Sequence, residues 1–65
     1  MTLAEFTEGL TTFQESQFHK LIQKLRSRGI AKPQPNDPDV KLFAEGLTIF
    51  QQSHFYKIAE SLLAN

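Results

Sequence analysis

A fifteen-residue segment that occurs twice is the feature that most constrains this fold. Residues 6–20 return thirty-seven positions later as residues 43–57, and ten of the fifteen aligned positions are identical. Five identical positions are polar: Glu8/Glu45, Thr11/Thr48, Gln14/Gln51, Ser16/Ser53 and Lys20/Lys57. Such a repeat indicates one supersecondary unit used twice. The polar identities leave two interpretations open, a recent duplication or positions kept for helix packing, turns or a shared binding surface.

Apolar residues open each unit with the three- and four-residue spacing of a helix. The two sets are Leu3, Phe6, Leu10 and Phe13, and Val40, Phe43, Leu47 and Phe50. Because this spacing continues through Gly9 and Gly46, we expect one helix across each glycine, where the missing side chain admits a closely packed partner helix. An alternative ends the helix at the glycine and begins the next at Thr11 or Thr48, each of which starts a Thr-x-x-Gln capping box.

A gap of five positions after each set predicts that the helix breaks there. Ser16 and Ser53 lie in these gaps and are expected to cap the next helix. The apolar stripes that follow are Phe18, Leu21, Ile22 and Leu25, and Phe55, Ile58, Ala59 and Leu62. The sequence thus predicts an all-α protein, two tandem αα-hairpins forming a small four-helix domain, with helices near 2–15, 17–28, 38–51 and 53–63.

Capping motifs mark the outer ends of both units. Thr2 and Glu5 form a capping box before the first helix, and Asp37 followed by Pro38 supplies an N-cap and an N1 proline before the third. Gly29 is typical of a Schellman stop after the second helix. We interpret the chain as a single domain, 1–65, with unit one at 2–29, a proline-containing linker at 30–37 and unit two at 38–65.

Size and charge indicate how the units are held together. A chain this short buries only about 60% of its unfolded surface, so its core gains from association or cross-links. There is no cysteine, which excludes disulfides and thiolate metal sites. The net charge is zero, but residues 1–32 carry two excess positive charges and residues 33–65 two excess negative charges. We expect these to attract each other, within the chain or between chains.

The sequence gives no indication of a membrane or export segment. No apolar stretch approaches the roughly 20 residues of a membrane helix, and the first residues lack the basic and apolar regions of a signal peptide. We therefore expect a cytoplasmic protein that makes no membrane contact.

The second unit resembles two helical families. Its pattern Gly46-x-x-x-Phe50-x-x-Ser53-x-Phe55-x-x-x-Ala59 is similar to a tetratricopeptide repeat, with a longer period and without that family's tryptophan and proline landmarks. Residues 43–62 look more like the opening hairpin of a small all-helical family of unknown function. That family's signature reads Gly-x-x-x-Phe-Asn-x-Gly-x-Tyr-x-Glu-Ala-His-Glu, and only Glu60 matches its final polar run. The resemblance implies a helical hairpin and no active site.

The candidate catalytic and metal-ligating residues favour structural roles. His19 and His54 occupy non-equivalent positions and have no Glu-x-x-His or i, i+4 histidine partner, so a metal site is not expected. Glu8 and Glu45 recur beside the glycines but lack an accompanying nucleophile or donor set, which favours solvated carboxylates. We predict no catalytic, cofactor-binding or metal-binding residue, and no enzyme.

Two sets of residues are candidate contact sites. The first is an apolar stripe of unit two that is polar in unit one: Leu42, Ile49, Tyr56 and Leu63 replace Glu5, Thr12, His19 and Arg26. The second is a basic run formed by Lys20, Lys24, Arg26, Arg28 and Lys32. The stripe either packs against unit one or forms an external contact. The run complements a helix C-terminus, and its lack of interleaved aromatic residues argues against nucleic acid as a ligand.

These observations predict a non-enzymatic protein-interaction or assembly module. We expect a homo-oligomer, a dimer that associates through unit two, or a helical protein partner bound at the same stripe. The alternative is a small nucleic-acid-binding or regulatory protein that uses the basic run from Lys20 to Lys32.

Overall fold

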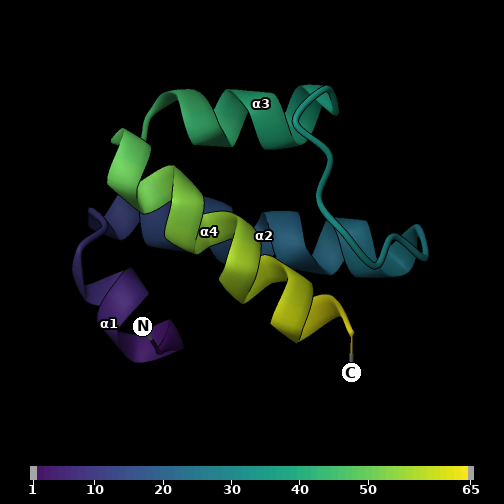
Figure 1. Ribbon diagram of the computed structural model, residues 1–65, viewed down its shortest axis with the longest axis horizontal. Coiled ribbons are helices and arrows are strands. Elements are labelled where there is room, and N and C mark those ends of the chain that lie inside the picture. The colour runs from purple at the N-terminus through teal and green to yellow at the C-terminus, as the bar shows by residue number, and fades with distance from the viewer. Residues whose placement is uncertain (1, 65) are drawn as a thin grey trace.

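Four helices and their short connections make up residues 2–64, the part of the chain that the computed structural model describes (Figure 1). The helices are α1 (Leu3–Glu8), α2 (Thr12–Ser27), α3 (Pro38–Glu45) and α4 (Ile49–Leu63). No strand occurs within these residues. The predicted all-α, four-helix class is confirmed. Met1 and Asn65, the ends of the predicted domain, lie outside the described residues.

Each helix begins at a polar residue whose side chain accepts a backbone hydrogen bond. Three capping boxes pair Thr2 with Glu5, Thr11 with Gln14 and Thr48 with Gln51. Asp37 caps α3 by accepting a hydrogen bond from the Asp39 N–H at 2.9 Å, directly before Pro38. These caps satisfy N–H groups that have no partner within the helix. The predicted caps of the first and third helices are therefore confirmed.

The predicted helices across Gly9 and Gly46 are wrong, because each glycine ends a short helix. Both have ordinary right-handed backbone angles, with φ of −82° and −83°. A Cβ atom at either position would lie at least 3.6 Å from its nearest neighbours, so no close helix contact requires a glycine there. Leu10 and Leu47 follow in the turn and are buried. They continue the apolar spacing past the point at which the helix stops.

The predicted helix breaks near Ser16 and Ser53 are also wrong. Both serines are exposed positions inside α2 and α4, and the helices begin instead at the Thr11 and Thr48 capping boxes of the alternative interpretation. The five-residue gap that suggested a break separates an exposed phenylalanine in the first turn from the buried stripe of the same helix.

A Schellman motif ends α2, as predicted. Gly29 has a positive φ of 73°, in the left-handed region that glycine adopts without strain. The Gly29 N–H donates to the Arg26 carbonyl and the Ile30 N–H to the Leu25 carbonyl, both at 3.0 Å. Ile30 then packs against the core. The chain is thereby turned out of the helix and into the linker.

The principal helix contacts run between the two units. α3 lies along α2, α1 lies against α4, and α4 crosses α2 (Figure 1). Exchanging α1 with α3 and α2 with α4 reproduces the same set of contacts. The units therefore face each other about an approximate two-fold axis, and each short helix is covered by the long helix of the other unit.

Two equivalent hydrogen bonds between the units follow the approximate two-fold symmetry. The Gln14 side-chain amide donates to the Gly46 carbonyl at 3.0 Å, and the Gln51 amide donates to the Gly9 carbonyl at 3.1 Å. The same glutamines accept the capping-box bonds through their side-chain oxygens. The repeated Thr-x-x-Gln therefore begins each long helix and also ties it to the turn of the opposite unit. This accounts for two of the five polar identities through helix capping and packing.

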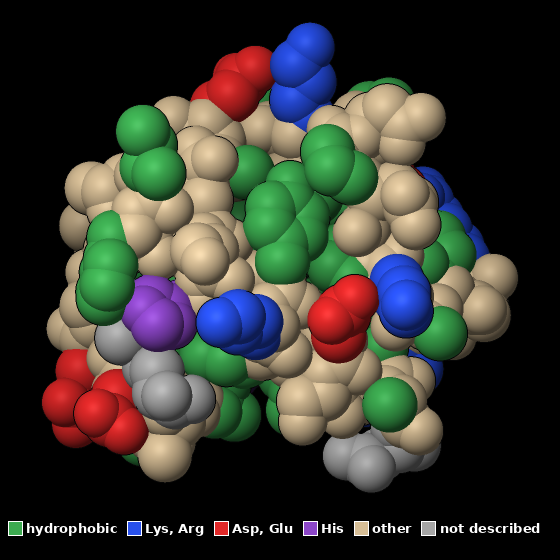
Figure 2. All heavy atoms as spheres, in the orientation of Figure 1, with side chains coloured by type: hydrophobic (Ala, Val, Ile, Leu, Met, Phe, Trp, Pro, Cys, Tyr) green, Lys and Arg blue, Asp and Glu red, His purple; other side chains and the backbone are tan. Residues whose placement is uncertain are grey.

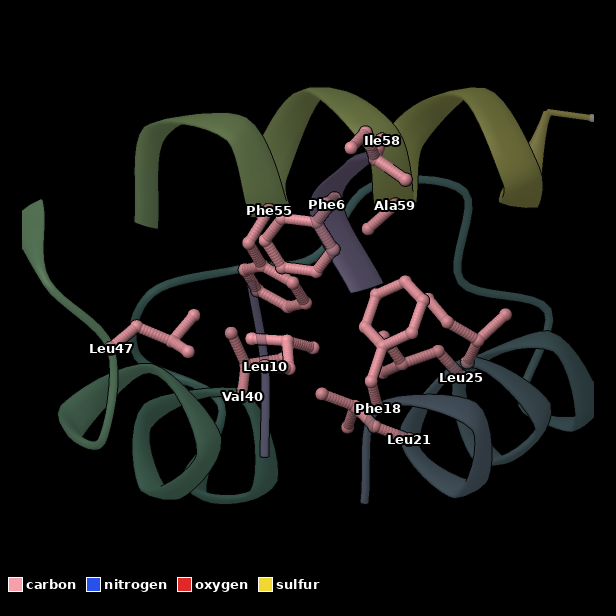
Figure 3. Close-up of a cluster of buried hydrophobic side chains, with 11 residues drawn as sticks. Phe6, Leu10, Phe18, Leu21, Leu25, Val40, Leu47, Phe55, Ile58 and Ala59 are labelled. Atoms are coloured by element: carbon pink, nitrogen blue, oxygen red, sulfur yellow. The ribbon is translucent and has the colours of Figure 1, made fainter. Parts of the chain in front are cut away.

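The core lies between α4 on one side and α2 and α3 on the other (Figure 3). Phe18 and Phe55, which are equivalent in the repeat, are fully buried with ring centroids 6.0 Å apart. Phe6 packs edge-on against Phe18 at 5.3 Å, and Phe43 lies 5.1 Å from Phe55. The radius of gyration is 10.7 Å, close to the roughly 11 Å expected for a compact chain of this length. The contacts that enclose this core lie within one chain.

Candidate interaction surface

The predicted interface residues fall into two pairs. Leu42 is 73% exposed and Ile49 is 87% exposed. Tyr56 and Leu63 are half-buried and pack against the core cluster. The second pair therefore contributes to the core within the chain, and the first pair leaves large apolar side chains in solvent.

Phe13 and Phe50, the last members of the two apolar sets that open the units, are further exposed residues. They are 72% and 66% exposed and occupy equivalent positions, the second residue of α2 and of α4. Their helical spacing from buried residues concealed this exposure. The capping boxes could have predicted it. If each long helix starts after Thr11 or Thr48, its second residue points away from the buried stripe that begins at Phe18 or Phe55.

An open groove of about 1000 Å³ runs between α2 and α3. Its apolar wall comes from Phe13, Leu42 and Phe43, and its polar wall includes the side chains of Gln17 and Lys20. Hydrophobic side chains also reach the surface between α3 and α4 on the face shown in Figure 2. A concave, mostly apolar surface with a few polar groups is typical of a binding site.

Most of the predicted basic run is engaged inside the molecule. Lys24 pairs with Asp39 at 3.3 Å, and Arg28 reaches the same carboxylate at 3.2 Å. Arg28 also lies 3.7 Å from the Asp37 carboxylate. The opposite charges of the two units are thus partly matched within one chain, at the junction of α2 and α3.

The other members of the run have different surroundings. The Arg26 guanidinium donates to the Leu62 carbonyl at 3.1 Å, where the last turn of α4 leaves carbonyls without helical partners. Lys20 and Lys32 are exposed and have no carboxylate within 4.0 Å among residues 2–64. Lys20 and Lys24 both line the groove, and Lys24 is already paired with Asp39, so within the described residues Lys20 is the unpaired cation of the run that faces a ligand bound there.

The remaining titratable groups do not converge on a site. Within residues 2–64 no three histidine, aspartate or glutamate side chains lie close enough together to hold a metal ion. His19 contacts the Phe18 ring and His54 contacts the Phe50 ring, with centroids 5.6 Å and 4.4 Å apart. The pKa of Glu5 is lowered by hydrogen bonds from the Thr2 backbone N–H and the Thr2 hydroxyl.

Comparison of the chain with models of protein families, with curated proteins and with solved structures finds no match. None of the helices within residues 2–64 has the length and apolar character needed to cross a bilayer. Two features of the surface point to a contact role: the groove between α2 and α3, and the large apolar side chains exposed at its rim and at the start of α4.

Proposed function

We propose that this protein is a non-enzymatic protein-interaction module that associates with itself through exposed apolar residues of unit two. The observation that supports this proposal is the exposure of Leu42 and Ile49, together with Phe13 and Phe50, on a chain that already encloses a compact core. Scattered apolar residues are normal on a protein surface, but here they line a concave groove and begin an adjacent helix.

The comparison between the two units strengthens the proposal. Leu42 and Ile49 stand where unit one has Glu5 and Thr12, so the same helical unit forms with polar residues at these positions. Intramolecular packing therefore does not require the apolar side chains. Burying each of them against a partner contributes about 1.5–3 kcal/mol, before the cost of association.

The test is to replace Leu42 with Glu and Ile49 with Thr, which copies the residues of unit one. Both side chains are exposed, so the free energy of unfolding is expected to change by less than about 1 kcal/mol. Sedimentation across a concentration series is expected to show weaker self-association than in the parent chain. Circular dichroism during urea unfolding gives the matching stability measurement.

The matched control changes the other two members of the stripe, Tyr56→His with Leu63→Arg. These side chains pack against the core, so this variant is expected to lose about 1–3 kcal/mol of stability. A parent chain that sediments as a monomer throughout the series, or a Leu42/Ile49 variant that associates as strongly as the parent, would refute the proposed function.

A further inference from the structure

The approximate two-fold axis relates the groove to a second surface of the same chain, and the two can be compared residue by residue. The groove face, defined by Phe13, Lys20, Lys24, Leu42 and Phe43, lies on α2 and α3. The equivalent surface lies on α1 and α4, where the hollow has a volume of only about 240 Å³. The two surfaces are built from equivalent positions of one repeat, so their differences show what distinguishes the groove.

At two of the equivalent positions this surface carries a carboxylate where the groove is uncharged. Glu5 stands at the position of Leu42, and Glu60 at that of Gln23. Phe50 matches Phe13 and is exposed, as is Leu3 at 38%. We call this surface, defined by Leu3, Glu5, Phe50 and Glu60, the acidic face.

The two faces carry opposite excess charges. Among the groove-lining residues, Lys20 and Lys24 are opposed by one carboxylate, Asp39. At the equivalent repeat positions the balance of charge is reversed, because the acidic face has two carboxylates, Glu5 and Glu60, and one lysine, Lys57, which lines its hollow. Exposed charge pairs contribute little affinity, but they determine which surfaces come together and in what orientation.

We propose that the chain self-associates head to tail, with the groove face of one copy receiving the acidic face of the next. The apolar residues match as well as the charges, since Phe50 and Leu3 would be covered by the wall that Phe13 and Leu42 form. A symmetric contact of groove against groove would instead join two surfaces that both carry excess positive charge. Charge complementarity therefore favours the pairing of unlike faces.

Head-to-tail contact has a structural consequence. α1 and α3 lie on opposite sides of the crossed α2–α4 pair (Figure 1), so one copy uses its two faces independently. A contact between unlike faces leaves one groove face and one acidic face free at the ends of each assembly. Such contacts build rings where the rotation closes and open chains where it does not.

This inference rests on the proposed self-association, and two double variants separate the two claims. Phe13→Ser with Leu42→Glu disables the groove face, and Phe50→Ser with Glu60→Lys disables the acidic face. Each variant removes one exposed phenylalanine and alters the charge at one further position, and all four residues are exposed. Circular dichroism and urea unfolding verify that both variants fold as the parent does.

Sedimentation of each variant alone, and of an equimolar mixture, is the deciding measurement. Each variant alone is expected to associate at least about tenfold more weakly than the parent. The mixture is expected to form a 1:1 complex, because each variant supplies the face that the other lacks. That complex is expected to stop at two chains, since its remaining faces are both disabled.

Other outcomes overturn the head-to-tail arrangement. If only the groove variant loses association and mixing restores nothing, the contact is symmetric through the groove; the proposed function then stands and this inference falls. If both variants associate like the parent, neither face is the contact. If the parent is monomeric throughout, the inference and the proposed function both fail.

Discussion

The glycines show how one residue type plays two different roles in this chain. Gly29 has a φ of 73°, which a side chain makes unfavourable, whereas Gly9 and Gly46 have right-handed angles and room for a Cβ atom. Only Gly29 is therefore required by the backbone. At the other two positions the folded backbone does not require glycine. Glycine there raises the conformational entropy of the unfolded chain and so lowers the stability of the protein.

Alanine substitution is expected to separate these roles. Gly9→Ala and Gly46→Ala should each stabilise the protein by about 0.4–1 kcal/mol, because alanine restricts the unfolded chain and fits the folded one. Gly29→Ala should destabilise it by about 1–2 kcal/mol, the cost of a left-handed side chain. Urea unfolding followed by circular dichroism measures all three; a loss of stability at Gly46→Ala would show that the turn does need glycine.

Glu5 is expected to make the stability of α1 depend on pH. Hydrogen bonds from Thr2 lower its pKa in the folded state. Its contribution is therefore complete above the unfolded pKa, roughly 4.3, and is lost as the pH falls through the folded pKa. Glu5→Gln keeps a capping box of the kind that Gln14 makes, but it removes the titration.

The measurement compares the free energy of unfolding of the parent and of Glu5→Gln between about pH 6 and about pH 3. The parent should be the more stable protein at the higher pH, where the Glu5 carboxylate is ionised, and this difference should shrink as the pH falls because only the parent loses that contribution. Equal losses would mean that the capping box does not carry this part of the pH dependence.

At the scale of the helices, the Thr-x-x-Gln motif has two functions. Its glutamine accepts the capping bond through the side-chain oxygen and donates across the molecule through the amide. Glutamate at the same place keeps the first function, as the Thr2–Glu5 box of α1 shows, and loses the second. The substitution therefore isolates the bond between the units.

Gln14→Glu is expected to lower the free energy of unfolding by about 0.5–1.5 kcal/mol, the net contribution of one hydrogen bond. Gln23→Glu is the matched control, because it makes the same chemical change on the exposed surface of α2. Thermal and urea unfolding compare the two variants. Equal effects at both positions would contradict a stabilising role for the Gln14–Gly46 bond.

The helix boundaries show which sequence patterns were informative. The caps at Thr2 and Asp37 and the Schellman stop at Gly29 predicted real helix ends, because each depends on local backbone hydrogen bonds. The apolar spacing misplaced the inner ends, because Leu10 and Leu47 are buried in turns and so prolong a helical pattern beyond its helix. Where the two patterns disagreed, capping was the better guide.

At the scale of the whole molecule, the repeat predicted two units but not how they meet. The four-helix class and most of the core followed from periodicity. The crossing of α4 over α2, and the exposure of Phe13 and Phe50, depend on the two-fold arrangement of the units. That arrangement involves contacts between residues far apart in sequence, such as Gln51 with Gly9, which no local pattern specifies. The groove is a product of the same arrangement.

The structure shows where the opposite excess charges of the two units lie. Part of it is matched inside the chain, where Lys24 and Arg28 meet Asp39. Another part lies on the two surfaces that the repeat relates, with Lys20 on the groove face and with Glu5 and Glu60 on the acidic face. One repeat unit, used twice with different surface residues, thus yields two complementary surfaces on one small molecule.

The central claim is that the exposed apolar surface of this compact chain is a contact surface. Amide chemical shifts recorded by nuclear magnetic resonance during serial dilution test it most directly. The account predicts concentration-dependent shifts that gather at the groove face and the acidic face, including Leu42 and Phe50, and unchanged core residues such as Phe18. Shifts that do not depend on concentration anywhere in the chain would contradict it.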